Sequence, residues 1–506
     1  MVSKAKSIAL YGLEGILIEV EADVFKGEER FDIVGLPDTA VKESKERVHS
    51  AIKNTTGSFP YTTITVNLAP ADVKKEGAYL DLPIAVTILR AVNNKLIRDI
   101  GSTVFIGELS LEGRLRPVSG ILPIVLFAKK QGLKRIVLPS ENAKEASLVS
   151  GVEIIPVGSL KEVIEYLSGA DIDPYPFTQF NPAEHGEYVN DLKYVKGQAV
   201  AKRALEVAVS GGHNMIMVGA PGSGKTMLAK CIPSIIPDMT FDEALETTAI
   251  YSVYGTLDKA EGVISKRPFV TPHHTSTNVA MVGGGSNSKP GLVSLAHNGV
   301  LYLDEMPEYT RQTLECLRQP LEDGVITVSR AKATIKYPAD FMLVASMNPC
   351  PCGNYGSTTA ECKCTDTQIR KYKAKISGPL LDRIDIQIHV DNVLYDDLVK
   401  ENLEESSEAV RKRVNKARLI QRERFLGEGI TCNAQMREKH LIKYCSLSKE
   451  DEQLLKRSFE VLGFSARARS RILKVARTIA DLDYSDNIET KHLLEAIGYR
   501  NSDIDK

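Results

Sequence analysis

Eight consecutive residues near the middle of the chain match G-x-x-x-x-G-K-[ST], a pattern whose residue types suit phosphate binding. They are Gly219, Ala220, Pro221, Gly222, Ser223, Gly224, Lys225 and Thr226. The mostly apolar run 214–218 before them predicts a buried strand, and residues 227–230 predict the start of a helix. The glycines let backbone N–H groups turn toward phosphate oxygens, the lysine reaches the terminal phosphates, and the threonine hydroxyl binds Mg²⁺. The pattern therefore predicts a site for ATP and magnesium.

A second apolar run, 299–305, ends in Asp304 and Glu305. It predicts a buried strand that delivers two carboxylates to its tip, where open α/β sheets bind ligands. There Asp304 would hold the magnesium, directly or through water, and Glu305 would polarise the attacking water as general base. The alternative is a surface pair of acids, which the phosphate pattern earlier in the chain disfavours.

Residues 341–346 predict another buried strand, which leads into Asn348. An amide at this strand end would orient the hydrolytic water, whereas an isolated Asn-Pro pair is more often a turn. Residues 320–338 predict a hairpin with Arg330 and Lys332 at its tip. Two cations there suggest contact with DNA, although a solvated turn has the same appearance.

Four cysteines lie within fifteen residues: Cys350, Cys352, Cys362 and Cys364. Four thiols so close together suit a tetrahedral structural zinc site that closes a loop. Their C-x-C spacing is less common than C-x₂-C, so reduced thiols without metal and a redox role stay open. The other four cysteines are scattered singly, which is not a disulfide framework.

The chain as a whole has almost no net charge, because 64 Lys and Arg face 65 Asp and Glu. Any contact with nucleic acid must therefore come from local basic patches. The runs 411–424 and 464–477 are candidates, unless they are simply solvated helix faces. No stretch approaches the ~20 apolar residues of a membrane span. We therefore expect no membrane insertion and a cytoplasmic location.

The fold class expected for the 506 residues is α/β with several domains. Residues 1–170 alternate strands, expected at 15–20, 62–68, 104–109, 135–138 and 154–157, with helices expected at 38–54, 82–92 and 120–131. Residues 171–190 are expected to form a linker. An α/β core follows over 191–395, with a helix at 198–210 before the phosphate pattern, and residues 396–506 are expected to be helical.

Residues 69–79 and 116–122 resemble the proteolytic domain of Lon proteases. The resemblance implies a ribosomal S5 domain 2-like α/β fold for the N-terminal domain. In that family a serine and a lysine form the catalytic dyad, at positions matched here by Tyr79 and Leu122. Neither residue can replace its counterpart, so the resemblance argues against peptidase activity.

Over nearly the whole chain, the motifs at 211–214, 219–226, 296–305, 348–353 and 377–386 resemble those of magnesium-chelatase-like AAA+ ATPases of the ComM/YifB family. The resemblance implies a hexameric ring with nucleotide at subunit interfaces and a C-terminal helical lid. Asn348 then matches the sensor 1 position, Arg383 the arginine finger supplied to the neighbouring subunit, and Arg467 the sensor 2 position. Arg469 and Arg471 lie close to the last position in the sequence. The hairpin with Arg330 and Lys332 matches an insertion that lines the pore.

For ComM members the resemblance implies an ATP-driven motor on single-stranded or branched DNA, which supports branch migration during natural transformation and works with recombination proteins. A chelatase motor subunit that drives insertion of magnesium into a tetrapyrrole is the second hypothesis, which the Lon-like domain disfavours. A regulatory assembly factor without activity is the third. The intact set of Lys225, Thr226, Asp304, Glu305 and Arg383 disfavours it.

Overall fold

The computed structural model describes residues 2–75, 77–182, 188–285, 289–330, 333–356, 360–393 and 403–500. The chain divides into two compact units. The first unit consists of Met1–Asn181 and Phe241–Ser265, and the second of Pro182–Thr240 and Lys266–Lys506. The segment Phe241–Ser265 falls inside the range 191–395 expected for the nucleotide core, yet it packs with the first unit. The chain therefore crosses between the units three times.

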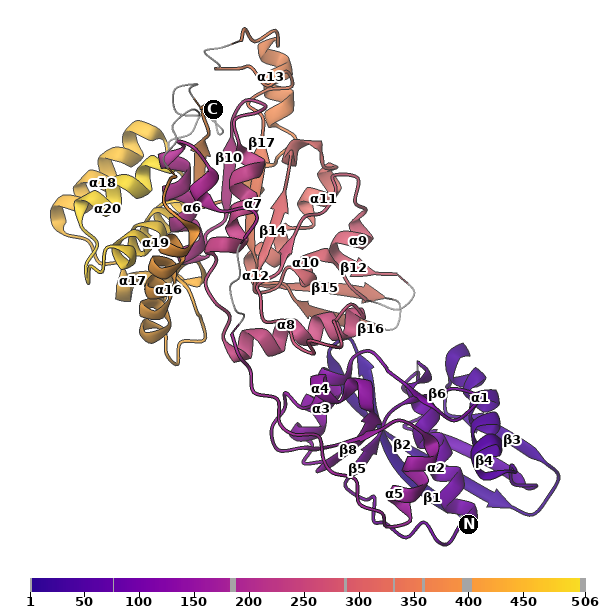
Figure 1. Ribbon diagram of the computed structural model, residues 1–506. Coiled ribbons are helices and arrows are strands. Elements are labelled where there is room, and N and C mark those ends of the chain that lie inside the picture. Colours follow the sequence, from indigo (N-terminus) through magenta and orange to yellow (C-terminus); the bar gives the residue numbers. More distant parts are fainter. Residues whose placement is uncertain are drawn as a thin grey trace. The chain divides into compact units, whose positions relative to one another are not determined.

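The first unit is built on a seven-stranded mixed sheet in the order β3-β4-β2-β1-β5-β8-β9 (Figure 1). Its strands are β1 (Val2–Tyr11), β2 (Glu14–Phe25), β3 (Arg30–Val34), β4 (Thr63–Ala69), β5 (Thr103–Phe105), β8 (Arg135–Pro139) and β9 (Glu153–Val157). The sequence did not predict β1 and β3. It predicted one strand over 104–109, but β5 ends at Phe105 and β6 (Glu108–Leu109) pairs separately with β7 (Leu115–Arg116). β1 is hard to recognise because Ala5 and Ala9, two of its buried residues, have small side chains.

Helices cover both faces of this sheet, since neighbouring strand residues such as Val104 and Phe105 point into different apolar cores. The core on one face takes residues from α1 (Thr39–Thr56), α2 (Asp81–Val92) and α5 (Leu160–Leu167). The other takes residues from α3 (Ile121–Lys130), α4 (Ala143–Ala146) and α8 (Phe241–Tyr254). Asp38 caps α1 by accepting a hydrogen bond from the N–H of Val41 at 2.8 Å, as the predicted start at residue 38 requires.

Helix α8 is tied into the first unit by polar as well as apolar contacts. Ala249 lies in the core beside α3, and the carbonyl of Ser252 accepts a hydrogen bond from the N–H of Gly120 at 3.1 Å. The hydroxyl of Ser252 also donates to the carboxylate of Glu145, whose pKa is raised by burial. A segment that follows the phosphate-loop helix in the sequence thus completes the core of the first unit.

The second unit contains a five-stranded sheet in the order β11-β14-β17-β10-β18, in which every neighbouring pair is parallel. The strands are β10 (Met215–Val218), β11 (Phe269–Val270), β14 (Val300–Leu303), β17 (Met342–Met347) and β18 (Ile386–His389). All five carboxyl ends therefore lie along one edge, called here the carboxyl edge, and all five amino ends lie along the opposite amino edge. β10, β14 and β17 confirm the strands predicted before the phosphate pattern, the two acids and Asn348.

Short helices and two hairpins surround this sheet. The helices are α6 (Ala199–Gly211), α7 (Lys225–Ile235), α9 (Asn278–Val282), α10 (Leu292–Leu295), α11 (Arg311–Glu315), α12 (Arg318–Asp323), α13 (Asp366–Lys373) and α14 (Gly378–Leu381). The predicted hairpin is confirmed as the antiparallel pair β15 (Val325–Arg330) and β16 (Ala333–Pro338). A second, unpredicted hairpin pairs β12 (Gly283–Gly284) with β13 (Lys289–Pro290).

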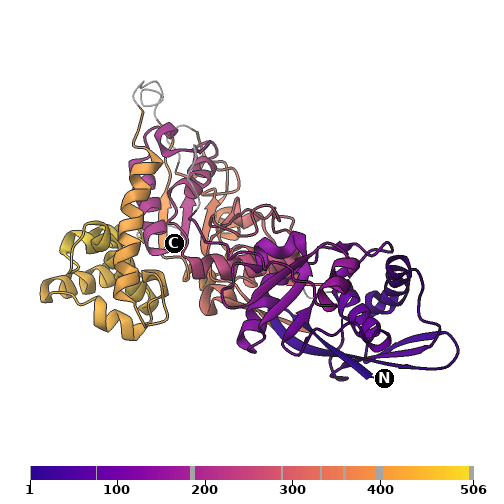
Figure 2. The same ribbon diagram turned by 60° about the horizontal axis from the view of Figure 1, so that its bottom comes forward.

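The C-terminal part of the chain is helical, as predicted. It contains α16 (Ser407–Arg424), α17 (Glu438–Tyr444), α18 (Lys449–Leu462), α19 (Ala466–Leu482) and α20 (Thr490–Gly498), which appear in orange to yellow in Figure 2. α16 and α19 both pack against α6, and residues such as Ile472 share one apolar core with Met215 of the sheet. The helical region is therefore joined to the sheet through a continuous core.

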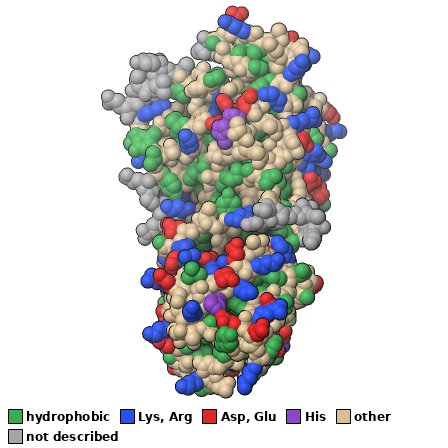
Figure 3. All heavy atoms as spheres, turned by 90° about the vertical axis from the view of Figure 1, so that its right-hand side faces the viewer, with side chains coloured by type: hydrophobic (Ala, Val, Ile, Leu, Met, Phe, Trp, Pro, Cys, Tyr) green, Lys and Arg blue, Asp and Glu red, His purple; other side chains and the backbone are tan. Residues whose placement is uncertain are grey.

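Charges on the surface are mostly balanced. In α16, Arg413 pairs with Glu206 and Glu405, and Arg424 pairs with Asp481, so much of the basic run 411–424 is neutralised within the chain. Figure 3 shows basic and acidic side chains interspersed on one face of the molecule.

Among the described residues, no helix combines the length and apolar character needed to cross a membrane.

Candidate nucleotide-binding site

The phosphate loop lies at the carboxyl edge of the sheet, between β10 and α7. All four residues of β10 are buried, and the N–H of Gly219 donates to the carbonyl of Met347 on the neighbouring β17 at 3.2 Å. Gly222 and Gly224 have φ of 81° and 93°, which favours glycine, and a Cβ at either would meet nothing within 4 Å. The backbone of the loop is therefore open on this side, and its last turn leads directly into the N-terminus of α7.

Lys225 is the first residue of α7 and only 8% exposed. Its Nζ donates to the carbonyls of Gly219 at 2.7 Å and Ala220 at 2.8 Å, so the ammonium lies inside the loop. Burial lowers the pKa of Lys225, while the nearby charges of Asp304 and Glu305 act in the opposite direction. A buried lysine between a phosphate-binding turn and two acids is positioned to exchange its carbonyl partners for phosphate oxygens.

Asp304 receives hydrogen bonds from three hydroxyl groups. Thr226 donates to its Oδ2 at 3.1 Å, Tyr302 donates to its Oδ1 at 2.9 Å, and Ser346 donates to the same Oδ1. Burial by itself would raise the pKa of this carboxyl, but the three hydroxyls bring that pKa below its ordinary value. The result is an ionised, oriented carboxylate beside the threonine of the phosphate loop, as a magnesium site requires.

The sequence analysis did not find Tyr302 and Ser346. Tyr302 precedes Asp304 by two residues on β14, so strand periodicity places both on one side of the sheet. Ser346 lies on β17, where Ala345 pairs with Leu303 of β14, so it becomes a neighbour of Asp304 only because these two strands are adjacent. The first was therefore visible as a pattern along one strand, but the second depends on which strands pair.

Glu305 follows Asp304 at the carboxyl edge and is exposed. Its backbone has φ 50°, an uncommon conformation for a residue with a side chain, and its N–H donates to Ser346 Oγ at 3.1 Å. One serine thus connects the two acids, accepting from the backbone of Glu305 and donating to the carboxylate of Asp304. This arrangement separates a partly buried acid, Asp304, from an exposed acid, Glu305, that water reaches.

Asn348 and Gln198 complete the surroundings of the loop. The Oδ1 atom of Asn348 accepts a hydrogen bond from Lys225 Nζ at 3.4 Å, which places the amide beside the lysine. Gln198, which the sequence analysis did not single out, precedes α6, and its Nε2 donates to the carbonyl of Ser223 at 3.1 Å and to that of Asp391. A side chain from the end of one helix therefore holds the phosphate loop to the segment after β18.

Arg383 lies at the opposite edge of the sheet. Its carbonyl accepts a hydrogen bond from Asn214 Nδ2 at 3.0 Å, and Asn214 directly precedes β10, whereas the loop begins with Gly219 at the other end. Five residues of extended chain span about 16 Å. Arg383 is 8% exposed, and its guanidinium donates to the carbonyl of Pro379 at 2.6 Å and pairs with Glu322. Its Nε is buried without a hydrogen-bond partner among the described residues.

Arg467 lies beside Arg383 in space. Its NH1 is 3.5 Å from the carboxylate of Asp382, and its side chain is 66% exposed. Arg469 pairs with Glu452 at 3.2 Å, and Arg471 pairs with the fully buried Asp385 at 2.8 Å. The structure thus brings Lys225, Thr226, Asp304 and Asn348 together at one edge and Arg383 and Arg467 at the other.

The structure describes the four clustered cysteines but only part of the hairpin predicted to contact DNA. The hairpin strands are described, but Lys332 and the side chain of Arg330 lie outside the described residues. The four clustered cysteines are all described, and their sulfur atoms lie within 4.8 Å of one another, a grouping that can hold a metal ion. All eight cysteines of the chain are free.

The positions of the Lon dyad hold no catalytic pair. Leu122 is fully buried in α3, and its N–H donates to Glu145 Oε1 at 2.8 Å. Tyr79 packs against the apolar cores on both faces of the sheet. Glu76, part of the matching stretch, lies outside the described residues. An aliphatic side chain in the core cannot act as the base of a dyad, so this pair of positions has a packing role.

The residues at the carboxyl edge fit ATP with Mg²⁺. The glycine turn exposes backbone donors, Lys225 supplies a cation inside it, and Thr226 with Asp304 offers two hard oxygen ligands of the kind that Mg²⁺ prefers. The loop also opens toward the N-terminus of an eleven-residue helix, where anions are favoured. This donor set suits a nucleotide phosphate chain and its metal.

Known protein families match the same parts of the chain. A family described as magnesium chelatase, subunit ChlI, matches residues 191–398, and its C-terminal family matches residues 404–500. A family described as subunit ChlI of Mg-chelatase matches residues 20–142 of the first unit. The chain is also 25% identical to the Lon protease of Azospirillum brasilense over 34% of this chain and 23% of that protein. The predicted Lon-like and AAA+ α/β folds are confirmed.

Two relatives match nearly the full length. Competence protein ComM of Haemophilus influenzae is 42% identical over 98% of this chain and 96% of its own length. The uncharacterised protein YifB of Escherichia coli is 41% identical over 97% of this chain and 96% of its own length. Both identity and coverage extend across the two units and the helical region. The chain therefore belongs to the ComM/YifB family of magnesium-chelatase-like AAA+ ATPases.

Proposed function

We propose that this protein is an ATP-hydrolysing hexameric motor that moves DNA, a branch-migration helicase that supports recombination and natural transformation. The main support for the proposal is that the residues expected to act on one nucleotide lie at two opposite edges of the sheet. Lys225, Asp304 and Asn348 meet at the carboxyl edge, while Arg383 lies about 16 Å of extended chain away at the amino edge. A complete site then needs a second chain, which a ring supplies.

Each residue at the carboxyl edge has a role that follows from its position. When bound, ATP with Mg²⁺ supplies the phosphoanhydride bond whose cleavage releases free energy. Lys225 and the loop amides hold the phosphates, and Thr226 and Asp304 hold the metal. Glu305, exposed and anchored through Ser346, takes the proton of the attacking water, and the amide of Asn348 orients that water.

The arginines at the amino edge serve the nucleotide of the neighbouring subunit. Arg383 pairs with Glu322 within its own chain and would exchange this acid for a terminal phosphate. Arg467 is exposed beside Asp382, next to Arg383, and so faces the same neighbour. Hydrolysis then changes which arginine contacts exist at an interface, and that change moves one subunit against the next.

DNA contact is assigned to the turn of the β15–β16 hairpin, with Arg330 and Lys332. Such cations grip phosphates without reading sequence, so binding weakens steeply as salt rises. We place the motor in the cytoplasm, a reducing compartment that suits eight free cysteines. Recombination proteins are the expected partners, because the named relative ComM is a competence protein.

The deciding experiment measures ATP turnover without DNA and with single-stranded, duplex and branched DNA, each at two salt concentrations. We expect stimulation by DNA, strongest with branched DNA, and a smaller effect at the higher salt concentration. The double variant Arg330→Ala, Lys332→Ala should lose the stimulation. Lys336→Ala, an exposed lysine on the same hairpin away from its turn, is the matched control. Turnover that ignores every DNA would contradict the proposal.

A chelatase motor subunit remains the second candidate, because the families matched over 191–398 and 404–500 are those of a magnesium chelatase subunit. For a chelatase motor subunit, we expect ATP turnover to be stimulated by a partner protein and unaffected by DNA. The family matched over residues 20–142 of the first unit is also described as a subunit of Mg-chelatase, so the first unit does not separate the two candidates. The similarity to competence protein ComM over nearly the full length favours the DNA motor.

A further inference from the structure

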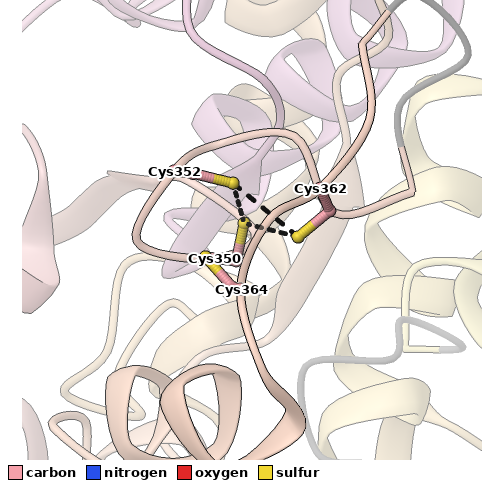
Figure 4. A group of neighbouring side chains, drawn as sticks. All are labelled: Cys350, Cys352, Cys362 and Cys364. Atoms are coloured by element: carbon pink, nitrogen blue, oxygen red, sulfur yellow. Dashed lines mark hydrogen bonds between the residues drawn. The ribbon is translucent and has the colours of Figure 1, made fainter.

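The four clustered cysteines occupy a loop between two elements of the nucleotide-binding unit. Cys350 and Cys352 follow β17 and Asn348, and Cys362 and Cys364 precede α13. Their sulfur atoms point toward one another in Figure 4, with Cys350 buried and the others partly or fully exposed. Cys350 Sγ lies 3.4 Å from Cys352 Sγ and 3.7 Å from Cys362 Sγ, and the last two sulfurs are 3.7 Å apart.

These distances suit one particular kind of centre. A tetrahedral zinc ion with sulfur ligands at 2.3 Å separates its ligands by about 3.8 Å. A disulfide would need a distance of about 2.05 Å between two of the sulfurs. A four-iron cluster would spread the sulfurs farther apart, since each cysteine binds a different iron atom. Three sulfurs held 3.4 to 3.7 Å apart, with that of Cys364 within 4.8 Å of each, therefore match a single tetrahedral ion.

The backbone around the cluster supports thiolate ligands. The N–H of Tyr355 donates to Cys350 Sγ at 3.3 Å. The N–H of Gly353 donates to the carbonyl of Cys350 at 3.0 Å, which closes a tight turn after the first cysteine pair. Gly353 has φ 82°, a conformation that favours glycine. Hydrogen bonds to ligand atoms are the usual second layer of a metal site, because they orient the ligands and stabilise their charge.

The same turn contacts the phosphate loop. A Cβ on Gly353 would lie 2.4 Å from Cδ of Pro221, so the proline ring packs closely against the backbone of Gly353. Asn348, whose amide accepts from Lys225, precedes the first cysteine by two residues. The cysteine loop thus contacts the phosphate-binding turn and follows directly after the asparagine that contacts Lys225.

We propose that Cys350, Cys352, Cys362 and Cys364 bind one Zn²⁺, and that the ion holds this loop against Pro221 and thereby shapes the nucleotide site. The zinc is structural, because four sulfurs fill its tetrahedral coordination and leave no position for water. The second part of the proposal rests on the proposed function, whereas the presence of zinc does not.

The first experiment measures metal in the full-length chain, purified under reducing conditions and dialysed against metal-free buffer, by elemental analysis and X-ray absorption. We expect one zinc per chain with four sulfur ligands at about 2.3 Å. Cys352→Ser and Cys364→Ser should lose the zinc. Cys316→Ser, a free cysteine outside the cluster, is the matched control and should retain it. Reduced protein without metal, or iron in place of zinc, would overturn the proposal.

The second experiment tests the connection to the nucleotide site through binding of a fluorescent ATP analogue, with no DNA present. Removal of the ion, by chelation of the unmodified protein or by Cys364→Ser, should weaken binding about tenfold, the lower end of the effect of lost supporting contacts around a metal site. Restoring zinc to the chelated protein should restore the affinity. Unchanged affinity for the analogue after proven loss of zinc would show that the zinc does not shape the nucleotide site. Because the assay contains no DNA, its result does not depend on whether the protein moves DNA.

Discussion

The two edges of the five-stranded sheet hold different kinds of side-chain cluster. At the carboxyl edge, groups from β14, β17 and the phosphate loop converge on one open turn, and Asp304 is held ionised by three hydroxyls. At the amino edge, arginines are matched by acids of the same chain, as in the pairs of Arg383 with Glu322 and Arg471 with Asp385. The first edge is open to a ligand, whereas the cations of the second are already paired with acids.

This difference is the basis for our proposal that one active site is divided between two subunits. Parallel strands place all their carboxyl ends at one edge, where phosphates and metal bind. A residue that precedes β18 cannot reach that edge within its own chain, since the length of β10 lies between. If this comparison is right, variants at the two edges should fail in different ways.

The largest effect is expected for Arg383→Ala. Loss of an arginine finger should slow turnover by about 1,000-fold, because the cation stabilises charge only in the transition state. Nucleotide binding, measured with a fluorescent ATP analogue, should be retained. Arg318→Ala, which removes an exposed arginine paired with Glu315, is the control and should have little effect.

A mixture of two inactive variants tests the division of the site directly. Lys225→Ala damages the carboxyl edge and Arg383→Ala the amino edge, so a mixed assembly contains some interfaces with both edges intact. Partial recovery of ATP turnover is expected. A mixture as inactive as its components would contradict the shared site.

The next effect is expected for Glu305→Gln, which should bind ATP but hydrolyse it about 100-fold more slowly, as for loss of a general base. Glu308→Gln is the matched control, because Glu308 is an exposed acid nearby that pairs with Lys375 at 3.4 Å. Steady-state ATPase rates and bound-nucleotide measurements check both variants. Near-normal turnover in Glu305→Gln would remove this residue from the proposed role.

Ser346→Ala should raise the magnesium concentration for half-maximal turnover about 10- to 100-fold, because the ligand Asp304 loses one of its orienting hydroxyls. The pKa of Asp304 should also rise toward its ordinary value. Since only the ionised carboxylate binds metal, the acidic limb of the pH profile of turnover should move to higher pH. Identical magnesium and pH profiles in variant and parent would show that Ser346 has no such role.

The smallest effect is expected for Arg467→Ala, about tenfold in turnover, the size of one lost hydrogen bond to a charged group. Its thermal stability should be unchanged, since exposed ion pairs contribute about 0–1 kcal/mol. Arg469→Ala should change neither property. Arg471→Ala should instead destabilise the protein, because it removes the arginine partner of the buried carboxylate of Asp385 and leaves it with His213. Melting curves and ATPase rates separate the three arginines.

The amino-acid sequence alone was enough to predict those features whose residues lie close together along the chain. The phosphate loop, the acids after β14 and the asparagine after β17 depend on spacing along one strand and turn, and that spacing is local. The helices α1, α2 and α3 and most strands of the first unit were also evident from periodicity, whereas α4, α5 and α8 were not predicted. β1 was not, because small side chains such as Ala5 and Ala9 give a weak pattern.

Tertiary structure decided which distant residues meet. Ser346 becomes a partner of Asp304 because β17 pairs with β14, and Arg383 is separated from Lys225 because it precedes β18, which runs parallel to β10. The placement of α8 in the first unit and the spacing of the four sulfurs likewise depend on contacts between segments far apart in the chain. Spacing in sequence determines the chemistry that a short segment can supply, but strand order and packing, which arise from burial of the whole apolar core, determine what that segment faces.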